Sequence, residues 1–282
     1  GYTVVIVNFL MLSYYNTLQA YALYYLYNSF QSPVPWSLCN MPWNTKSCHT
    51  IESASLKLNT TYDDNITLPA TEFFSRKVLG VHLSDGFHHL NGVKWDMLFS
   101  VLFIYILTTG CLIKGIKSSG KAVYVTALLP YVCLLVLITQ SLFLEGSYDG
   151  LRYYLMPRFD KLFELDVWRA AAIQIFFNLG PGFGVLITYS SYSSKNTNIQ
   201  KLTIMSSIVN CFTSLLYGFV VFAGLGYMAK RINKDINYFL RDGIGIVFAV
   251  YPEIISAFKA PYIYAIVFFL MLISLGMDSA FG

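Results

Sequence analysis

The sequence predicts an all-α polytopic membrane protein, and both its composition and its apolar stretches support this fold class. Hydrophobic residues make up 56% of the 282 residues, charged residues only 12%, and the mean hydropathy is +0.54. A soluble domain has about 25% charged residues, so much of this chain is expected to be solvated by lipid. Six stretches are long enough to cross about 30 Å of hydrocarbon, which takes roughly 20 helical residues. The net charge of +4 is modest and not clustered, so nucleic-acid binding is not expected.

The six expected spans belong to a single transmembrane domain, 1–282. They cover approximately residues 2–30, 97–116, 122–143, 169–192, 203–228 and 262–282. The first span contains Asn8, Asn16 and Gln19, so one of its faces is expected to lie against protein or a cavity. The chain begins without an initiator methionine and stops within an apolar run, which indicates a domain that is incomplete at both ends.

The loop at about 31–96 is the longest polar region, and we expect it to lie outside the cell. It contains Cys39 and Cys48, nine residues apart, and two glycosylation sequons that begin at Asn59 and Asn65. Stable disulfides and used sequons both occur on the extracellular side of a membrane, so the combination predicts a large glycosylated extracellular loop. Unpaired thiols and unused sequons are the alternative.

If the chain crosses the membrane six times and this loop lies outside, both chain ends lie on the cytoplasmic side. The loops at 117–121 and 193–201 then lie on the cytoplasmic side as well. The other outside loops, at 144–168 and 229–261, carry more Lys and Arg than these, which disagrees with the positive-inside tendency. We give the sequons more weight. The last outside loop contains short amphipathic stretches that either dip into a vestibule or cap the membrane surface. They are expected to be split by Gly243, Gly245 and Pro252.

The fourth span is expected to be broken at its centre, from Gly180 to Gly184. Three glycines and a proline fall within this stretch, and in a helix interior glycine costs about 1 kcal/mol and proline about 3 kcal/mol relative to alanine. Unwound backbone at membrane depth is tolerated only where protein buries it or where it lines a cavity. Such a break exposes free carbonyls and a half-helix N-terminus, which suit cations and anions respectively. A simple packing kink is the alternative.

Polar side chains in three of the spans are candidate ion ligands. Gln174 and Asn178 are four residues apart, so they share one helix face, and Asn210 with Ser214 repeats that spacing on the next span. Asp278 lies in the last apolar span, where a carboxylate is costly and needs a cation or another partner. It is therefore the strongest candidate ion ligand. Hydrogen bonding between helices is the alternative for these groups.

Four motifs resemble the neurotransmitter:sodium symporter family and occur in the family's order over essentially the whole chain. They are SYYNT with AYALYYLYNSF in the first span, PWSLCNMPWNTKSC in the outside loop, QIFFNLGPGFGVLITYSSY in the broken span and FFLMLISLGMDSA at the end. The resemblance implies the third to eighth helices of a twelve-helix transporter, in which two inverted repeats surround a site at the membrane midplane. SYYNT together with GPGFGV is most similar to the monoamine branch.

This resemblance implies a function and a set of partners. It implies a multi-pass plasma-membrane symporter that takes up a biogenic monoamine, serotonin or dopamine, by alternating access. Sodium and chloride are the implied co-transported ions, and no other cofactor is implied.

The family's motifs also imply the roles of individual residues. The substrate positions are Met11, Tyr14, Tyr15, Asn16, Phe177, Gly180, Phe183 and Val185. The sodium positions are Asn178, Asn210, Leu275, Asp278 and Ser279, and the chloride positions are Gln174, Asn178 and Ser214. Within the substrate set, Tyr15 and Phe177 match the aromatic pair that closes over the substrate.

Departures from the family pattern keep other functions open. Asn178 stands where this branch has serine; its amide offers both an oxygen and an N–H, but it is bulkier. After Tyr192 the usual NKF is replaced by SSK, and Leu202 stands where the family has an acidic residue, so the cytoplasmic gate is altered. The alternatives are an amino-acid transporter of the same family and a non-transporting binding or regulatory protein. An enzyme is not expected, because the histidines of the outside loop lack a nucleophile–base pattern.

Overall fold

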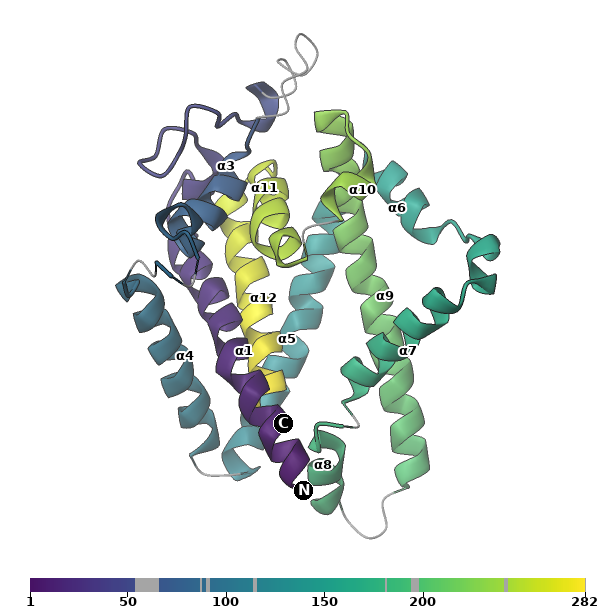
Figure 1. Ribbon diagram of the computed structural model, residues 1–282. Coiled ribbons are helices and arrows are strands. Elements are labelled where there is room, and N and C mark those ends of the chain that lie inside the picture. The colour runs from purple at the N-terminus through teal and green to yellow at the C-terminus, as the bar shows by residue number, and fades with distance from the viewer. Residues whose placement is uncertain are drawn as a thin grey trace.

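The computed structural model is a bundle of helices with long, partly helical connections at one end (Figure 1). It describes residues 1–53, 66–86, 88–89, 92–113, 116–180, 182–193, 198–240 and 243–281. The longer helices are α1 (Tyr2–Asn28), α4 (Trp95–Leu112), α5 (Ile116–Leu142), α6 (Ser147–Leu155), α7 (Leu165–Leu179), α8 (Val185–Ser191), α9 (Ile199–Ile232) and α12 (Pro261–Phe281). The shorter ones are η1 (Pro35–Ser37), α3 (Pro69–Glu72), η2 (Phe73–Leu79), η3 (Val81–Leu83), η4 (Phe159–Phe163), α10 (Ile236–Phe239), η5 (Ile246–Val250) and α11 (Tyr251–Ser256). No strand occurs within these described ranges, so the all-α prediction is confirmed.

Four of the described helices are both long and apolar enough to cross a membrane. They comprise Trp95–Leu112, Val123–Leu142, Ile199–Ile232 and Pro261–Ala280, and they coincide with four of the six predicted spans. The first predicted span is α1, whose 27 residues are about 40 Å long. It contains the buried amides of Asn16 and Gln19 and is not among those four helices. The remaining span is divided into α7 and α8, as predicted.

The densest part of the core lies where α1 meets the loop at 31–96 and α12. The Tyr25 ring is fully buried and lies 4.8 Å from the Phe269 ring and 5.2 Å from the Trp36 indole, measured between centroids. Each of these aromatic side chains buries a large apolar area, and the stacked and tilted ring pairs add further stability. This cluster fixes the loop on the end of the bundle.

A close helix pair, α6 and α9, forms a second layer of the fold (Figure 1). A β-carbon at Gly150 would lie 1.9 Å from the carbonyl oxygen of Phe222, and one at Gly226 would lie 2.5 Å from the carbonyl oxygen of Gly146. Only glycine at both positions allows the two backbones to approach this closely. The predicted loop at 144–168 therefore contains a packed helix that the sequence analysis did not anticipate.

The loop at 31–96 contains the predicted disulfide and is further fixed by one carboxylate. Cys39 and Cys48 are joined, while the sequons at Asn59 and Asn65 do not fall within the described residues. The Glu72 carboxylate accepts hydrogen bonds from the backbone N–H of Thr45 at 2.8 Å and from the Thr67 hydroxyl at 2.6 Å. Burial raises the pKa of this carboxyl, but the hydrogen bonds to it outweigh burial and hold the pKa below its ordinary value.

The loop at 229–261 contains the predicted short helical stretches, with two corrections. Gly243 lies between α10 and η5, as expected, but neither Gly245 nor Pro252 splits a helix. Gly245 is itself helical directly before η5, and helical structure runs from Ile246 to Ser256 through Pro252. Proline is tolerated there because it is the second residue of α11, directly after the π-helical turn η5, where the backbone hydrogen-bond pattern changes. In the next position Glu253 is buried, and its carboxylate accepts a hydrogen bond of 3.0 Å from the backbone N–H of Ala70. This contact joins the loop at 229–261 to the loop at 31–96.

The contact of Glu253 gives the fold a pH dependence that can be measured. Burial raises the pKa of Glu253 from 4.5 to about 8, so folding favours the neutral carboxyl. The contribution of this group to stability is therefore complete below its unfolded pKa and is lost as the pH rises towards 8. We expect the melting temperature of the full-length protein to fall by about 2 °C between pH 6 and pH 9 on this account.

The matched variants are Glu253→Gln and, as a control, Glu164→Gln at an exposed carboxylate. Glu253→Gln is expected to flatten the pH profile and to melt above the wild type at pH 9, because glutamine cannot ionise. Glu164→Gln is expected to retain the wild-type profile. Parallel profiles for the wild type and Glu253→Gln would contradict the assignment.

Candidate functional site

The predicted break in the fourth span occurs between α7 and α8. Helix α7 ends at Leu179, α8 begins at Val185, and the described residues between them, Gly180 and 182–184, are not helical. Gly180 and Gly184 have φ angles of +59° and +82°, in the left-handed region that glycine adopts without strain. Two glycine positions are thus required by backbone conformation as well as by helix propensity. Pro181 lies outside the described residues.

The unwound segment is held against the first helix. The Asn8 side-chain amide donates a hydrogen bond of 3.0 Å to the carbonyl oxygen of Phe183. A β-carbon at Gly184 would lie 2.9 Å from Cγ1 of Val4, so this backbone also approaches α1 closely. Figure 1 shows α8 beside the N-terminal end of α1. A polar backbone group that the break frees is therefore paired with a polar side chain of the first span.

The predicted substrate positions on the broken span lie around the break, and two of those on α1, Met11 and Tyr15, lie on the helix face that also carries Asn8. The rings of Phe177 and Phe183 meet edge to face at 6.0 Å between centroids. Asn8, Met11 and Tyr15 are spaced three and four residues apart, so they share a face of α1. The rings of Tyr15 and Phe177 make no contact in the part of the chain that the structure describes.

Asn16 is the most unusual of the predicted substrate positions. Its side chain is buried, and its Oδ1 has no hydrogen-bond partner among the described residues. A buried acceptor without a partner costs about 1–3 kcal/mol, so an additional donor would stabilise this site. The neighbouring Tyr14 is instead 54% exposed and points to another part of the surface.

The predicted sodium positions of the last span lie together near α5 and α1. The Asp278 carboxylate accepts a hydrogen bond from the Thr126 hydroxyl of α5. The Ser279 hydroxyl lies 3.3 Å from the carbonyl oxygen of Leu275, one turn earlier. A carboxylate, a hydroxyl and a carbonyl oxygen are thus within one turn of α12, and hard cations prefer oxygen ligands of these kinds.

Two polar partners of this cluster were not assigned a site role from the sequence. Thr126 is one; a single hydroxyl in an apolar span is too common to signal a site. Gln19 is the other: its amide donates a hydrogen bond of 2.9 Å to the carbonyl oxygen of Gly276 and connects α1 to the same turn of α12. Its presence beside Asn8 and Asn16 in the first span was the available signal.

The predicted chloride positions are only partly brought together. Gln174 donates a hydrogen bond of 3.3 Å to Oδ1 of Asn178, which fits the shared face expected from their spacing. Ser214 is exposed and Asn210 half-buried on α9, and in the described chain neither is hydrogen-bonded to that pair. Helix α7 has no buried residue, so packing does not fix its distance from α9.

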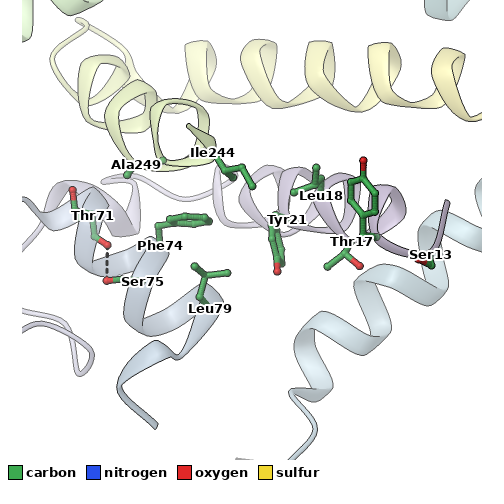
Figure 2. A pocket seen from close by; sticks show the side chains of 12 residues that line it. Ser13, Thr17, Leu18, Tyr21, Thr71, Phe74, Ser75, Leu79, Ile244 and Ala249 are labelled. Atoms are coloured by element: carbon green, nitrogen blue, oxygen red, sulfur yellow. Dashed lines mark hydrogen bonds between the residues drawn. The ribbon is translucent and has the colours of Figure 1, made fainter. Parts of the chain in front are cut away.

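A cavity of about 600 Å³ lies on a different face of α1 from the break. Figure 2 shows Thr17 and Tyr21 of α1 facing Phe74 of η2, with Ile244 above them. Among the described residues that line it, Tyr14 is the one predicted substrate residue, and none comes from α7 or α8. This cavity is therefore separate from the unwound segment.

Comparison with known proteins gives a family match over the whole chain. Residues 1–282 match the sequence profile described as the Sodium:neurotransmitter symporter family. The chain is 43% identical over 282 residues to a sodium-dependent serotonin transporter of Drosophila melanogaster, covering all of this chain and 44% of that protein. It is 40% identical over 284 residues to a sodium-dependent dopamine transporter of Bos taurus, covering all of this chain and 40% of that protein. The chain thus spans about two fifths of the length of these relatives.

Proposed function

The chain belongs to the sodium:neurotransmitter symporter family, and on that premise we propose that the full-length protein takes up a biogenic monoamine together with sodium and chloride. The family consists of transporters and not of enzymes, in agreement with the sequence analysis. Serotonin and dopamine are the first substrates to test, because relatives that match the whole chain are named for them.

The observation that carries this proposal is the unwound segment between α7 and α8 and its contact with α1. Free carbonyls in an apolar environment need a partner, and Asn8 provides one for Phe183 at 3.0 Å. The half-helices on either side direct their partial charges to the same place. Such a segment suits a small cationic or polar solute at the membrane midplane, as in other transporters with discontinuous helices. In this proposal Phe177, Gly180 and Val185 surround the substrate with Met11, Tyr15 and Asn16 of the first span.

The ion roles follow from the chemistry of the ligands. Sodium coupling is a property of the family, and we assign it to the oxygen atoms of Leu275, Asp278 and Ser279 on α12. For chloride we assign the amides of Gln174 and Asn178, since each offers N–H donors to an anion. In this assignment Asn210 and Ser214 complete the two sites when α7 moves towards α9.

Alternating access provides the mechanism of this proposal. Helix α7 is exposed along its length, whereas α1, α5 and α12 pack into one bundle. Rigid-body movement of the broken helix relative to that bundle would open the site to one side at a time. Ion binding shifts the population towards the state that accepts substrate, because the ions bind that state more tightly. We place the protein in the plasma membrane, with the loop at 31–96 outside.

The test is an uptake assay in cells that express the full-length protein, with surface biotinylation as the expression control. Radiolabelled serotonin and dopamine are offered in medium containing sodium chloride, in medium with N-methylglucamine for sodium, and in medium with gluconate for chloride. We expect uptake of one amine that falls to background without sodium and drops severalfold without chloride.

Two outcomes would overturn the proposal. Sodium-dependent uptake of an amino acid such as leucine or glycine, with no uptake of either amine, would establish an amino-acid transporter. Normal surface expression with saturable binding of an amine and no uptake would establish a non-transporting binding protein. The altered residues at Asn178 and Leu202 make these comparisons necessary.

A further inference from the structure

A cavity of about 490 Å³ at the start of α4 is lined by a concentration of basic side chains. The basic residues that line it are Arg76, Lys77, His82 and Lys94. Trp43 and Trp95 form aromatic walls, and Asp96 is the one acidic residue among those described around it. A cavity with this composition has a positive potential and is complementary to an anion.

The basic groups are held in place rather than spread into solvent. The Lys94 ammonium donates hydrogen bonds to the carbonyl oxygens of Lys77 at 2.9 Å and Val78 at 3.2 Å. Lys77 lies 5.8 Å above the centre of the Trp43 ring, and its ammonium is 3.8 Å from the Asp96 carboxylate. Backbone, ring and carboxylate contacts therefore fix two cations on one side of the cavity.

The basic groups lower one another's pKa values, which indicates that nearby acidic groups do not neutralise their positive charge. Burial, followed by the nearby charges of Arg76 and Lys94, lowers the pKa of His82. Burial and then the charge of Lys77 lower the pKa of Lys94, although Asp96 acts in the opposite direction. An anion bound among these groups would raise both pKa values and stabilise their charged forms.

Two side-chain hydrogen-bond donors of residues that line the basic cavity have no partner among the described residues. Nε of Arg76 and Nε1 of Trp43 are buried and have no hydrogen-bond partner in the described part of the chain. Buried polar atoms without partners are rare in native proteins and point to a ligand or water that supplies the acceptor. An oxyanion supplies several acceptors at once, and arginine binds phosphate in this manner.

A second cavity of about 490 Å³ adjoins the first and is apolar. It lies between α1 and α4, and Asp96 lines both cavities. Leu23 and Tyr27 of α1 line one side, and Phe99 and Phe103 of α4 line the other. Asp96, Phe99 and Phe103 are spaced three and four residues apart on one face, so the groove runs from the basic cavity along a membrane-spanning helix.

We propose that the two cavities together bind one phospholipid of the adjacent leaflet, with its phosphodiester among Arg76, Lys77 and Lys94 and an acyl chain between α1 and α4. The apolar groove favours a lipid over a free anion, because a free anion would leave that groove without a ligand. Trp95, 64% exposed at the first residue of α4, lies where tryptophan concentrates at membrane interfaces. The site lies apart from the transport residues and does not depend on their assignment.

The experiment is native mass spectrometry of the full-length protein in detergent, titrated with dioleoylphosphatidylglycerol. The double variant Arg76→Gln/Lys77→Gln is expected to weaken binding of this lipid by about tenfold or more, since each basic group near a headgroup contributes independently. The control Lys161→Gln/Lys234→Gln removes the same charge from other loops and is expected to bind as the wild type does. Inorganic phosphate at millimolar concentration serves as the probe for a free-anion site.

The apolar half of the site has its own matched pair of variants. Phe103 and Leu102 are 51% and 53% exposed on α4, but only Phe103 lines the groove. Phe103→Ser is expected to weaken lipid binding by about fivefold, whereas Leu102→Ser leaves it unchanged. If phosphate binding depends on Arg76 and Lys77 while Phe103→Ser has no effect on lipid binding, the ligand of this site is a free anion. That result would overturn the proposal. Lipid binding that is equal in all the variants would also overturn it.

Discussion

Replacing Gly180-Pro181-Gly182 by Ala-Leu-Ala is expected to reduce sodium-dependent uptake by the full-length protein to less than about one tenth of the wild-type rate. The three replacements together favour a continuous helix by about 5 kcal/mol, because glycine and proline are the poorest helix formers. Gly180 also has a φ angle of +59°, which alanine adopts only with strain. The variant is therefore expected to join α7 to α8 as one helix.

A continuous helix removes the chemistry that the break provides. The carbonyl oxygen of Phe183 would turn into the helix and bond within it, and Asn8 would lose an acceptor at 3.0 Å. The substrate positions around the break would then rotate relative to the first span. Because both the ion-binding and substrate-binding groups depend on the unwound backbone, we expect a loss of transport and not merely a change of affinity.

Surface biotinylation in the same cells separates a transport defect from a folding defect. The matched control is Gly110→Ala in α4, where an added β-carbon meets no atom within 4 Å and the helix is continuous. This control is expected to retain wild-type uptake. If the triple variant reaches the surface normally and transports sodium-dependently at the wild-type rate, the unwound segment is a packing feature without a role in transport.

The parts of the fold that could be predicted from the sequence are those that local chemistry decides. Composition and run length identify the apolar spans, because nothing but lipid or a protein core solvates twenty apolar residues. The break at Gly180–Gly184 follows from the intrinsic cost of glycine and proline in a helix. The disulfide between Cys39 and Cys48 could also be expected from their short spacing in a polar loop.

The remaining features depend on contacts between distant segments. Helix α6 packs on α9 because Gly150 and Gly226 allow close approach, and neither glycine is distinctive within its own segment. Likewise, the buried position of Glu253 depends on Ala70 from another loop. Pro252 illustrates the opposite error: a residue that breaks helices in general is accommodated directly after the π-helical turn η5.

In the candidate site, too, the features that depend on local sequence could be predicted and those that depend on distant contacts could not. The spacing of Gln174 and Asn178 was sufficient to expect their hydrogen bond, since it depends only on helix geometry. The pairing of Asp278 with Thr126 joins residues 152 positions apart and has no local signal. Whether α7 approaches α9 depends on packing along its whole length, which the sequence of one helix does not encode.

Asp278→Asn is expected to raise the sodium concentration required for half-maximal uptake by at least about tenfold. Asp278 lies in an apolar span, where a carboxylate needs compensation. Its hydrogen bond from Thr126 supplies one donor but no positive charge, and no described basic group lies within salt-bridge distance. A bound cation is the compensation that this arrangement lacks. Asparagine preserves the shape and the acceptor oxygen while removing the charge.

The thermal stability of the purified full-length protein in sodium chloride and in N-methylglucamine chloride distinguishes an ion ligand from a structural carboxylate. A ligand that binds only the folded state raises the melting temperature, so the wild type should melt higher in sodium and Asp278→Asn should show little difference between the two salts. Thr126→Val serves as the matched control: it removes the hydrogen bond but leaves the charge, and we expect it to retain the sodium-dependent shift. If Asp278→Asn keeps the wild-type shift while Thr126→Val is equally destabilised in both salts, the carboxylate acts through its bond to α5 and sodium binds elsewhere. If the shift disappears in Asp278→Asn alone, the charge of Asp278 is what binds sodium, because Thr126→Val removes the hydrogen bond and keeps the charge, whereas Asp278→Asn removes the charge and keeps an acceptor oxygen.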